Sequence, residues 1–206
     1  MAHQLTPRQA LDRLLDGNQR FIRDEREHPH QDAQRRSDLA AGQHPFAVLF
    51  GCGDSRLAAE IIFDTGLGDL FVVRTAGHVA ESAVIGSLEY PVVDLDTPLI
   101  VVLGHDSCGA VTATVESVTE GKMPPGYVRN VVERIMPSTF SKYLPDQPMI
   151  NDIVKEHTRQ SAERLLEQSH IIADAVRGGT CAVVGMFYHL ADGEVEIVFA
   201  EGNLKK

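Results

Sequence analysis

Two short segments of the sequence carry residue types that could do chemistry together. The segment CGDSR places Cys52, Asp54 and Arg56 at alternate positions directly after the apolar run FAVLFG. The segment GHDSCGA places His105 and Cys108 three residues apart after the apolar run LIVVLG. Thiolate and imidazole are the ligands that zinc prefers, and a catalytic zinc site typically has three protein ligands and one open position. The two segments therefore predict a zinc site formed by Cys52, His105 and Cys108.

Asp54 and Arg56 have two alternative arrangements beside such a site. The Asp54 carboxylate is close enough in sequence to Cys52 to take the fourth zinc position, which would close the site. It can instead turn away, pair with Arg56 and accept a hydrogen bond from zinc-bound hydroxide, which would leave the site open. Two thiolates and one imidazole leave the zinc formally neutral, so we expect an activity that rises into the alkaline pH range.

A competing interpretation of GHDSCG is a serine or cysteine nucleophile with His105 as its base. The spacing is G-x-x-S-x-G rather than the G-x-S-x-G of a nucleophile elbow, and a histidine two or three residues before the nucleophile is poorly placed to serve it. The third cysteine, Cys181, lies inside the strand-like run TCAVVGMFY, where we interpret it as a small buried side chain.

Apolar runs alternate with helical patterns from residue 46 onward. The runs that predict strands are 46–51, 70–74, 99–104 and 181–188. The segments that predict helices are 57–64, 82–93, 109–120 and 151–175. Strands that are apolar throughout indicate a parallel sheet covered on both faces. The expected fold is α/β, with a central, mostly parallel β-sheet flanked by helices.

Four further features complete this prediction. Asp192-Gly193 followed by EVEIVF indicates a hairpin that adds an antiparallel edge strand near the C-terminus. The amphipathic stretch 6–23 predicts an N-terminal helix that packs on the body or on a partner subunit. Pro91 is expected to kink or end its helix early. The stretches 24–32 and 137–148 are expected to be surface loops.

Composition limits the class of protein. The 206 residues are 43% hydrophobic and 23% charged, which indicates a single globular domain, with a helical arm at 1–41 and an α/β core at 42–206. The formal charge is −10 and no basic cluster stands out, so neither nucleic acid nor a membrane is an expected partner. The start of the chain does not look like a signal peptide and no apolar run could span a bilayer, so we expect a cytoplasmic protein.

The motif CGDSR together with GHDSCGA resembles the β-class carbonic anhydrase family. The resemblance runs from about Gln43 to Glu120 and includes FVVRTAGHV and GSLEY. It implies one zinc ion per subunit held by Cys52, His105 and Cys108, with Asp54 and Arg56 as a catalytic dyad that gates the fourth position. The implied reaction is the reversible hydration of carbon dioxide to bicarbonate and a proton.

The resemblance also implies a substrate pocket and an assembly. By it, Gln43 would hydrogen-bond substrate, Phe71, Ala76 and Tyr90 would line an apolar pocket for carbon dioxide, and the Gly109 amide would lie beside the zinc water. The family forms homodimers or homotetramers with active sites at the dimer interface, where the N-terminal helix embraces the partner.

One regulatory feature of some family members is incomplete in this sequence. Arg74 and Tyr188 match two members of a separate inhibitory bicarbonate site, but its tryptophan is replaced by Leu49. Two other functions remain open at this point. One is a zinc hydrolase acting on a related linear molecule such as carbon disulfide or carbonyl sulfide. The other is a non-catalytic zinc or thiol-sensing module in which Asp54 permanently fills the fourth position.

Overall fold

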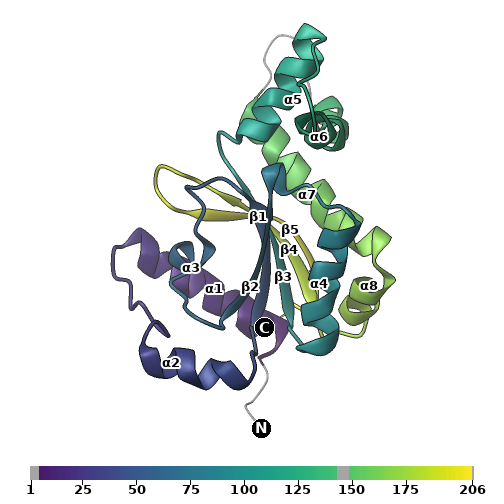
Figure 1. Cartoon of the computed structure of the whole chain (residues 1–206). Coiled ribbons are helices and arrows are strands. Elements are labelled where there is room, and N and C mark those ends of the chain that lie inside the picture. Colours follow the sequence, from purple (N-terminus) through teal and green to yellow (C-terminus); the bar gives the residue numbers. More distant parts are fainter. Residues whose placement is uncertain (1–4, 143–148, 206) are drawn as a thin grey trace.

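The core of the protein is one mixed β-sheet with helices on both of its faces (Figure 1). The computed structural model describes residues 5–142 and 149–205. Within them the strand order is β2-β1-β3-β4-β5, in which only the β4–β5 pair is antiparallel. The strands are β1 (Ala47–Cys52), β2 (Leu70–Thr75), β3 (Leu99–His105), β4 (Ala182–Tyr188) and β5 (Val195–Gly202). The expected fold class, including the antiparallel edge strand, is confirmed.

The connections between the strands are mostly helical. The α-helices are α1 (Pro7–Ile22), α2 (Ala33–Asp38), α3 (Ala59–Ile62), α4 (Ser82–Asp94), α5 (Gly109–Glu120), α6 (Val128–Lys142), α7 (Ile150–Gln168) and α8 (His170–Arg177). Short 3₁₀ turns follow α2 and β2, namely η1 (Leu39–Ala41) and η2 (Ala76–His78). None of the described helices combines the length and the apolar character that a membrane span needs.

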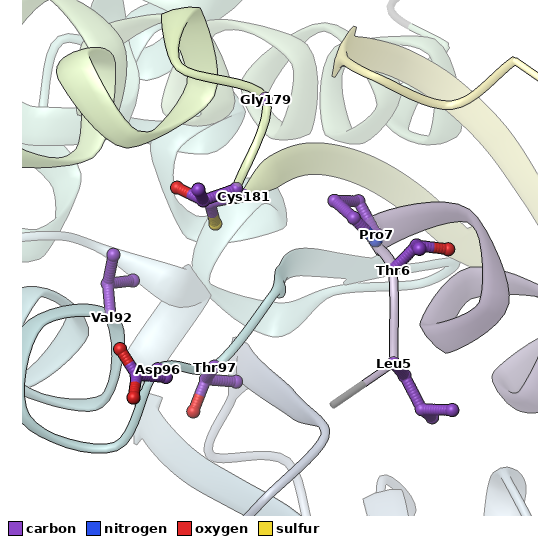
Figure 2. A pocket seen from close by; sticks show the side chains of 9 residues that line it. Leu5, Thr6, Pro7, Val92, Asp96, Thr97, Gly179 and Cys181 are labelled. Atoms are coloured by element: carbon purple, nitrogen blue, oxygen red, sulfur yellow. The ribbon is translucent and has the colours of Figure 1, made fainter. Parts of the chain in front are cut away.

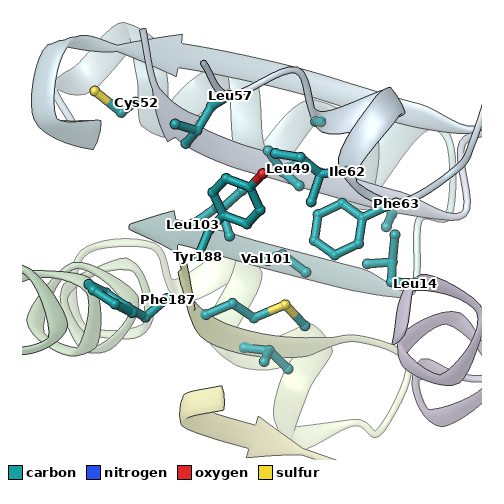
Figure 3. Packing of buried hydrophobic residues seen from close by; sticks show 14 of the residues in the cluster. Leu14, Leu49, Cys52, Leu57, Ile62, Phe63, Val101, Leu103, Phe187 and Tyr188 are labelled. Carbon is teal, nitrogen blue, oxygen red and sulfur yellow. The ribbon is translucent and has the colours of Figure 1, made fainter. Parts of the chain in front are cut away.

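The three central strands are buried along their whole length because each sheet face meets its own helices. One face, with Leu49, Val101 and Leu103, packs against residues of α1 and α3 (Figure 3). The other face, with Phe50 and Val102, packs against residues of α4, α7 and α8. Successive side chains of a strand point to opposite faces, so a strand covered on both sides must be apolar at every position. This is the pattern that made the strands recognisable in the sequence.

Helix α1 begins at a capping box and packs onto the core of its own subunit. The Thr6 hydroxyl accepts a hydrogen bond from the Gln9 amide, and the Gln9 side chain accepts one from the Thr6 amide. Buried Asn18 donates to the carbonyls of Ile62 and Gly193, 3.2 and 2.8 Å away. The expected contact of this helix with its own body is confirmed.

Three local expectations differ from the structure. Helix α4 does not end early at Pro91 but continues to Asp94, because a proline in the last turn leaves only the Ser87 carbonyl without its helical donor. The segment 151–175 is two helices, broken at Ser169, whose hydroxyl accepts from the Ile172 amide and caps α8. The segment 137–142 belongs to α6 rather than to a loop, while 143–148 lies outside the described residues.

Candidate metal centre

Strands β1 and β3 bring the two sequence motifs to one edge of the sheet. The strands are adjacent and parallel, with Gly51 paired to Leu103, so Cys52 and His105 leave the sheet side by side. Cys108 follows as the N-cap residue of α5. One potential ligand atom from each of Cys52, His105 and Cys108 lies within 4.8 Å of the other two, and all three residues are buried. This cluster is the group predicted from the sequence.

The hydrogen bonding of His105 fits a metal ligand. Its Nδ1 lies 2.8 Å from the backbone carbonyl of Asp106, and because a carbonyl only accepts, Nδ1 carries the proton. The lone pair is then on Nε2, which is buried and has no hydrogen-bond partner among the described residues. An unpartnered buried acceptor is costly, and a metal ion at the cluster would satisfy it.

The two thiols interact strongly and titrate as a pair. A hydrogen bond from the Cys108 thiol, the largest contribution, lowers the pKa of Cys52 to about 4, although burial opposes the shift. The Gly77 amide assists by donating to the Cys52 Sγ at 3.4 Å. The same thiol hydrogen bond and burial raise the pKa of Cys108. The lowered pKa of Cys52 favours its thiolate, which is the form that binds a divalent ion, and such an ion would also displace the proton of Cys108.

Asp54 and Arg56 form a two-pronged ion pair at the mouth of the cluster. Arg56 Nε and Nη2 donate to the Asp54 carboxylate over 2.9 and 2.7 Å, and the Arg56 amide donates to it over 3.0 Å. These hydrogen bonds hold the pKa of Asp54 well below its usual range. The carboxylate is turned toward Arg56, which is the open one of the two arrangements that the sequence allowed.

Arg74 contributes to the site in a way that sequence reasoning did not anticipate. Its Nε donates to the Cys52 carbonyl at 2.9 Å, and its Nη2 donates to the Asp54 carbonyl at 2.5 Å. Arg74 thus fixes the turn that carries Cys52 and Asp54. Arg74 lies opposite Gly51 in the β1–β2 pair. Its acceptors are backbone carbonyls, which every residue has, so the sequence does not indicate these contacts.

The structure brings only some of the predicted substrate residues to the cluster. Ala76 follows the β2 position paired with Cys52, and Gly109 follows Cys108. Phe71 pairs with Val48 near the opposite end of the strands, and its ring lies 6.0 Å from that of Tyr90. Gln43 precedes β1, whose six residues span about 20 Å. Within one chain, these three residues lie away from the ligands.

A cavity of about 300 Å³ lies at the other end of the strands (Figure 2). Asp96 and Thr97 line it before β3, and Cys181 lines it before β4. Cys181 is buried and burial raises its pKa to about 12, so it remains a neutral thiol, as its apolar surroundings in the sequence indicated. This cavity is separate from the candidate metal centre, because the ligands leave the opposite edge of the sheet.

The fold and the cluster define an α/β protein in which two thiols and an imidazole that could hold a metal ion meet at the carboxyl ends of the strands. Residues 47–195 match the family model described as carbonic anhydrase. The chain is 51% identical to a carbonic anhydrase of Mycolicibacterium smegmatis, with 93% of each chain covered. It is 48% identical to carbonic anhydrase 2 of Mycobacterium tuberculosis, with 96% of each covered.

Solved structures agree with this match. The β-carbonic anhydrase CcaA is similar with a TM-score of 0.71 and 26% identity, covering 91% of this chain and 86% of that one. A Coccomyxa β-carbonic anhydrase solved with acetazolamide has a TM-score of 0.74 at 23% identity, covering 93% and 88%. The chain belongs to the carbonic anhydrase family, in its β class, and is an enzyme, a lyase.

Proposed function

We propose that the protein catalyses the reversible hydration of carbon dioxide to bicarbonate and a proton, with one zinc ion per subunit held by Cys52, His105 and Cys108. The observation that carries the proposal is the convergence of three buried ligand atoms within 4.8 Å, one of them the unpartnered His105 Nε2. Two thiolates and an imidazole suit zinc better than magnesium or calcium, which prefer oxygen ligands. When bound, zinc would supply a Lewis acid that lowers the pKa of water and so makes it a nucleophile.

In this proposal Asp54 orients the attacking water and Arg56 holds Asp54 in place. The carboxylate accepts three hydrogen bonds from Arg56, two from its guanidinium and one from its amide, and retains a lone pair for one further donor. Because its pKa is held low, Asp54 remains an acceptor throughout the neutral range. Rotation of Asp54 away from Arg56 would bring the carboxylate to the fourth ligand position and close the site, so the pair acts as a gate.

The substrate pocket is completed, we propose, by a second copy of the chain. Gln43, Phe71 and Tyr90 lie near the outer strand β2 and the start of β1, away from their own ligands. Tyr90 is 46% exposed although its ring lies beside that of Phe71. A homodimer that placed these residues at the partner's centre would supply an apolar wall for an uncharged linear substrate. A related fungal β-carbonic anhydrase is described as tetrameric, which agrees with an assembly of this kind.

Stopped-flow carbon dioxide hydration against pH, on protein of measured zinc content, tests the proposal. We expect a rate that rises into the alkaline range in the wild type. His105→Ala should lose both zinc and activity, whereas Cys181→Ser, which replaces the cysteine outside the cluster, should keep both. Hydration at the uncatalysed rate by fully zinc-loaded protein would refute the proposed activity.

The same preparation separates the alternatives. Sulfide release from carbonyl sulfide or carbon disulfide faster than carbon dioxide hydration would assign the protein to a related hydrolase. A fourth zinc ligand contributed by Asp54 at every pH, with no hydration, would indicate a non-catalytic module. Light scattering on active protein tests the shared pocket, since an active monomer contradicts it.

A further inference from the structure

The 3₁₀ turn η2 supplies a backbone donor to the candidate metal centre. The Gly77 N–H donates to the Cys52 Sγ over 3.4 Å. Gly77 has φ +60° and ψ +26°, which is the left-handed region that glycine adopts without strain. A Cβ on this residue would lie 2.8 Å from both the Ala110 Cβ and the Ile135 Cδ1. The turn therefore fits closely between α5 and α6. Contacts that hold Gly77 in this position also hold its N–H against the Cys52 Sγ.

The other side of Gly77 is held by a buried histidine of α7. His157 is 1% exposed, and its Nε2 lies 2.9 Å from the Gly77 carbonyl oxygen. Burial lowers the pKa of His157 to about 4, so its ring is neutral and carries one N–H. Because a carbonyl only accepts, that proton is on Nε2 and Nδ1 is an acceptor. The Ser138 hydroxyl of α6 lies 3.0 Å from Nδ1 and 2.9 Å from the Gln160 Oε1, so its single proton is available to either of these two acceptors.

A ring contact adds to this hydrogen bond. The ring of His78, the next residue of the turn, lies 4.4 Å from that of His157, with the planes inclined by 36°. His78 is fully buried, and its Nδ1 has no hydrogen-bond partner among the described residues. The turn is thus anchored to α7 by the His157–Gly77 hydrogen bond, by a longer hydrogen bond of 3.5 Å between the Thr158 Oγ1 and the His78 Nε2, and by one ring contact. Of these, only the hydrogen bond from His157 acts directly on Gly77.

We infer that His157 is a positioning residue for the metal centre: by donating to the Gly77 carbonyl, it holds the Gly77 N–H on the Cys52 sulfur. The N–H and the carbonyl of Gly77 belong to successive peptide planes joined only by φ and ψ, so fixing the carbonyl restrains the direction of the N–H. A hydrogen bond to a thiolate withdraws electron density from sulfur and stabilises the anion against protonation. This inference rests on the proposed function, because it concerns the metal that the cluster would bind.

The inference predicts a metal centre that changes when the donor is removed. Partners that orient metal ligands from outside typically contribute about 10- to 100-fold to metal affinity. We expect His157→Leu to weaken Zn²⁺ binding by about that factor. In Co²⁺-loaded protein, the thiolate-to-metal charge-transfer band should move to longer wavelength, because the sulfur loses its donor. A merely structural role for His157 would lower stability without moving this band.

A donor-retaining variant and a matched control make the test specific. His157→Gln places an amide N–H near the original Nε2, so its Zn²⁺ affinity should stay within a few-fold of wild type and its Co²⁺ spectrum should be unchanged. Leu165→Ala creates a cavity on the same helix, in the buried cluster that contains Phe50 and Val102. It should lower the melting temperature without shifting the spectrum. If His157→Leu fails to fold, His157→Met removes the same donor with a more adaptable side chain.

Competition of Zn²⁺ against a chelating dye and the absorption spectrum of Co²⁺-loaded protein are the two measurements. If His157→Leu or His157→Met folds and keeps the wild-type Zn²⁺ affinity and Co²⁺ spectrum, the role of His157 is overturned while the proposed metal centre stands. Equal losses in His157→Leu and His157→Gln would overturn it as well. A wild-type protein that shows no thiolate band with Co²⁺ would overturn the metal centre and, with it, this inference.

Discussion

Gly104 and Gly51 each precede a candidate ligand, but substitution by alanine should lower the unfolding free energy only at Gly104. Gly104 precedes His105, and a Cβ on it would lie 2.1 Å from the Thr158 Oγ1 and 3.0 Å from the Val154 Cγ1. Gly51 precedes Cys52, and its Cβ would meet nothing closer than 3.5 Å. Both glycines are buried in parallel strands, so differences in solvent exposure do not enter the comparison.

The size of the effect follows from the contact. An ordinary contact begins near 3.4 Å, so the Thr158 hydroxyl must move by more than 1 Å or rotate, and rotation breaks its 2.9 Å hydrogen bond to the Val154 carbonyl. Overpacking of this kind costs about 1–3 kcal/mol, whereas alanine gains about 0.5–1 kcal/mol over glycine in a strand. Gly104→Ala should therefore lower the unfolding free energy by about 1–2 kcal/mol, and Gly51→Ala should leave it equal or slightly raised.

Thermal unfolding of the two variants measures the difference. A loss of about 1–2 kcal/mol in a chain of this length lowers the melting temperature by about 2–8 °C. Thr158→Ala removes the clashing oxygen, so the double variant with Gly104→Ala should lose about 1 kcal/mol less than the sum of the single losses. A Gly104→Ala protein as stable as Gly51→Ala, or strictly additive losses, would refute the proposed contact between β3 and α7.

Three further predictions concern the gate, the turn that carries it and a buried carboxylate. Asp54→Asn should keep zinc, measured by metal analysis, but lose about 100-fold in kcat; full activity at all pH values would remove Asp54 from the mechanism. Arg74→Met should lower the unfolding free energy by about 1 kcal/mol because the Cys52 and Asp54 carbonyls lose their donor; an unchanged denaturation midpoint would count against this contact. Burial opposes ionisation of Asp64, but its hydrogen bonds, with Arg20 foremost, hold its pKa below the usual value. This stabilisation is present above about pH 4 and is lost as the pH falls through the lowered folded-state pKa. Asp64→Asn should therefore cost about 2 kcal/mol at pH 7 and less below pH 4, measured by urea unfolding; a cost independent of pH would contradict it.

The ligands and the strands could be predicted from the sequence because both depend on local pattern. A parallel strand covered on both faces is apolar at every position, so a thiol or an imidazole directly after it stands out. The neighbouring positions of β1 and β3 then bring Cys52 and His105 together. Predicting the cluster of Cys52, His105 and Cys108 required only these two motifs and the assumption that the two strands are adjacent. The sheet order confirms that assumption.

The supporting contacts could not be predicted because they join distant segments through the backbone. Arg74 donates to carbonyls, and His157 reaches a carbonyl 80 positions away. Neither acceptor depends on a side-chain type, so no residue pattern marks it. Helix α6 was missed for a different reason, since Pro137 in its interior is typical of a loop but is tolerated in this packed helix.

The three residues of the cluster are buried, whereas Arg56 beside them is exposed, and this difference has a physical explanation. Cys108 and His105 are fully buried, and Cys52 is 6% exposed, whereas the Arg56 side chain is 52% exposed. Two thiolates and a divalent ion are formally neutral together, so such a centre can lie in the core without the cost of an isolated charge. In the proposed gate Asp54 and Arg56 would separate on closing, and an ion pair with one exposed partner contributes little to stability. A fully buried pair would cost several times as much to break, and would hold the gate in one position.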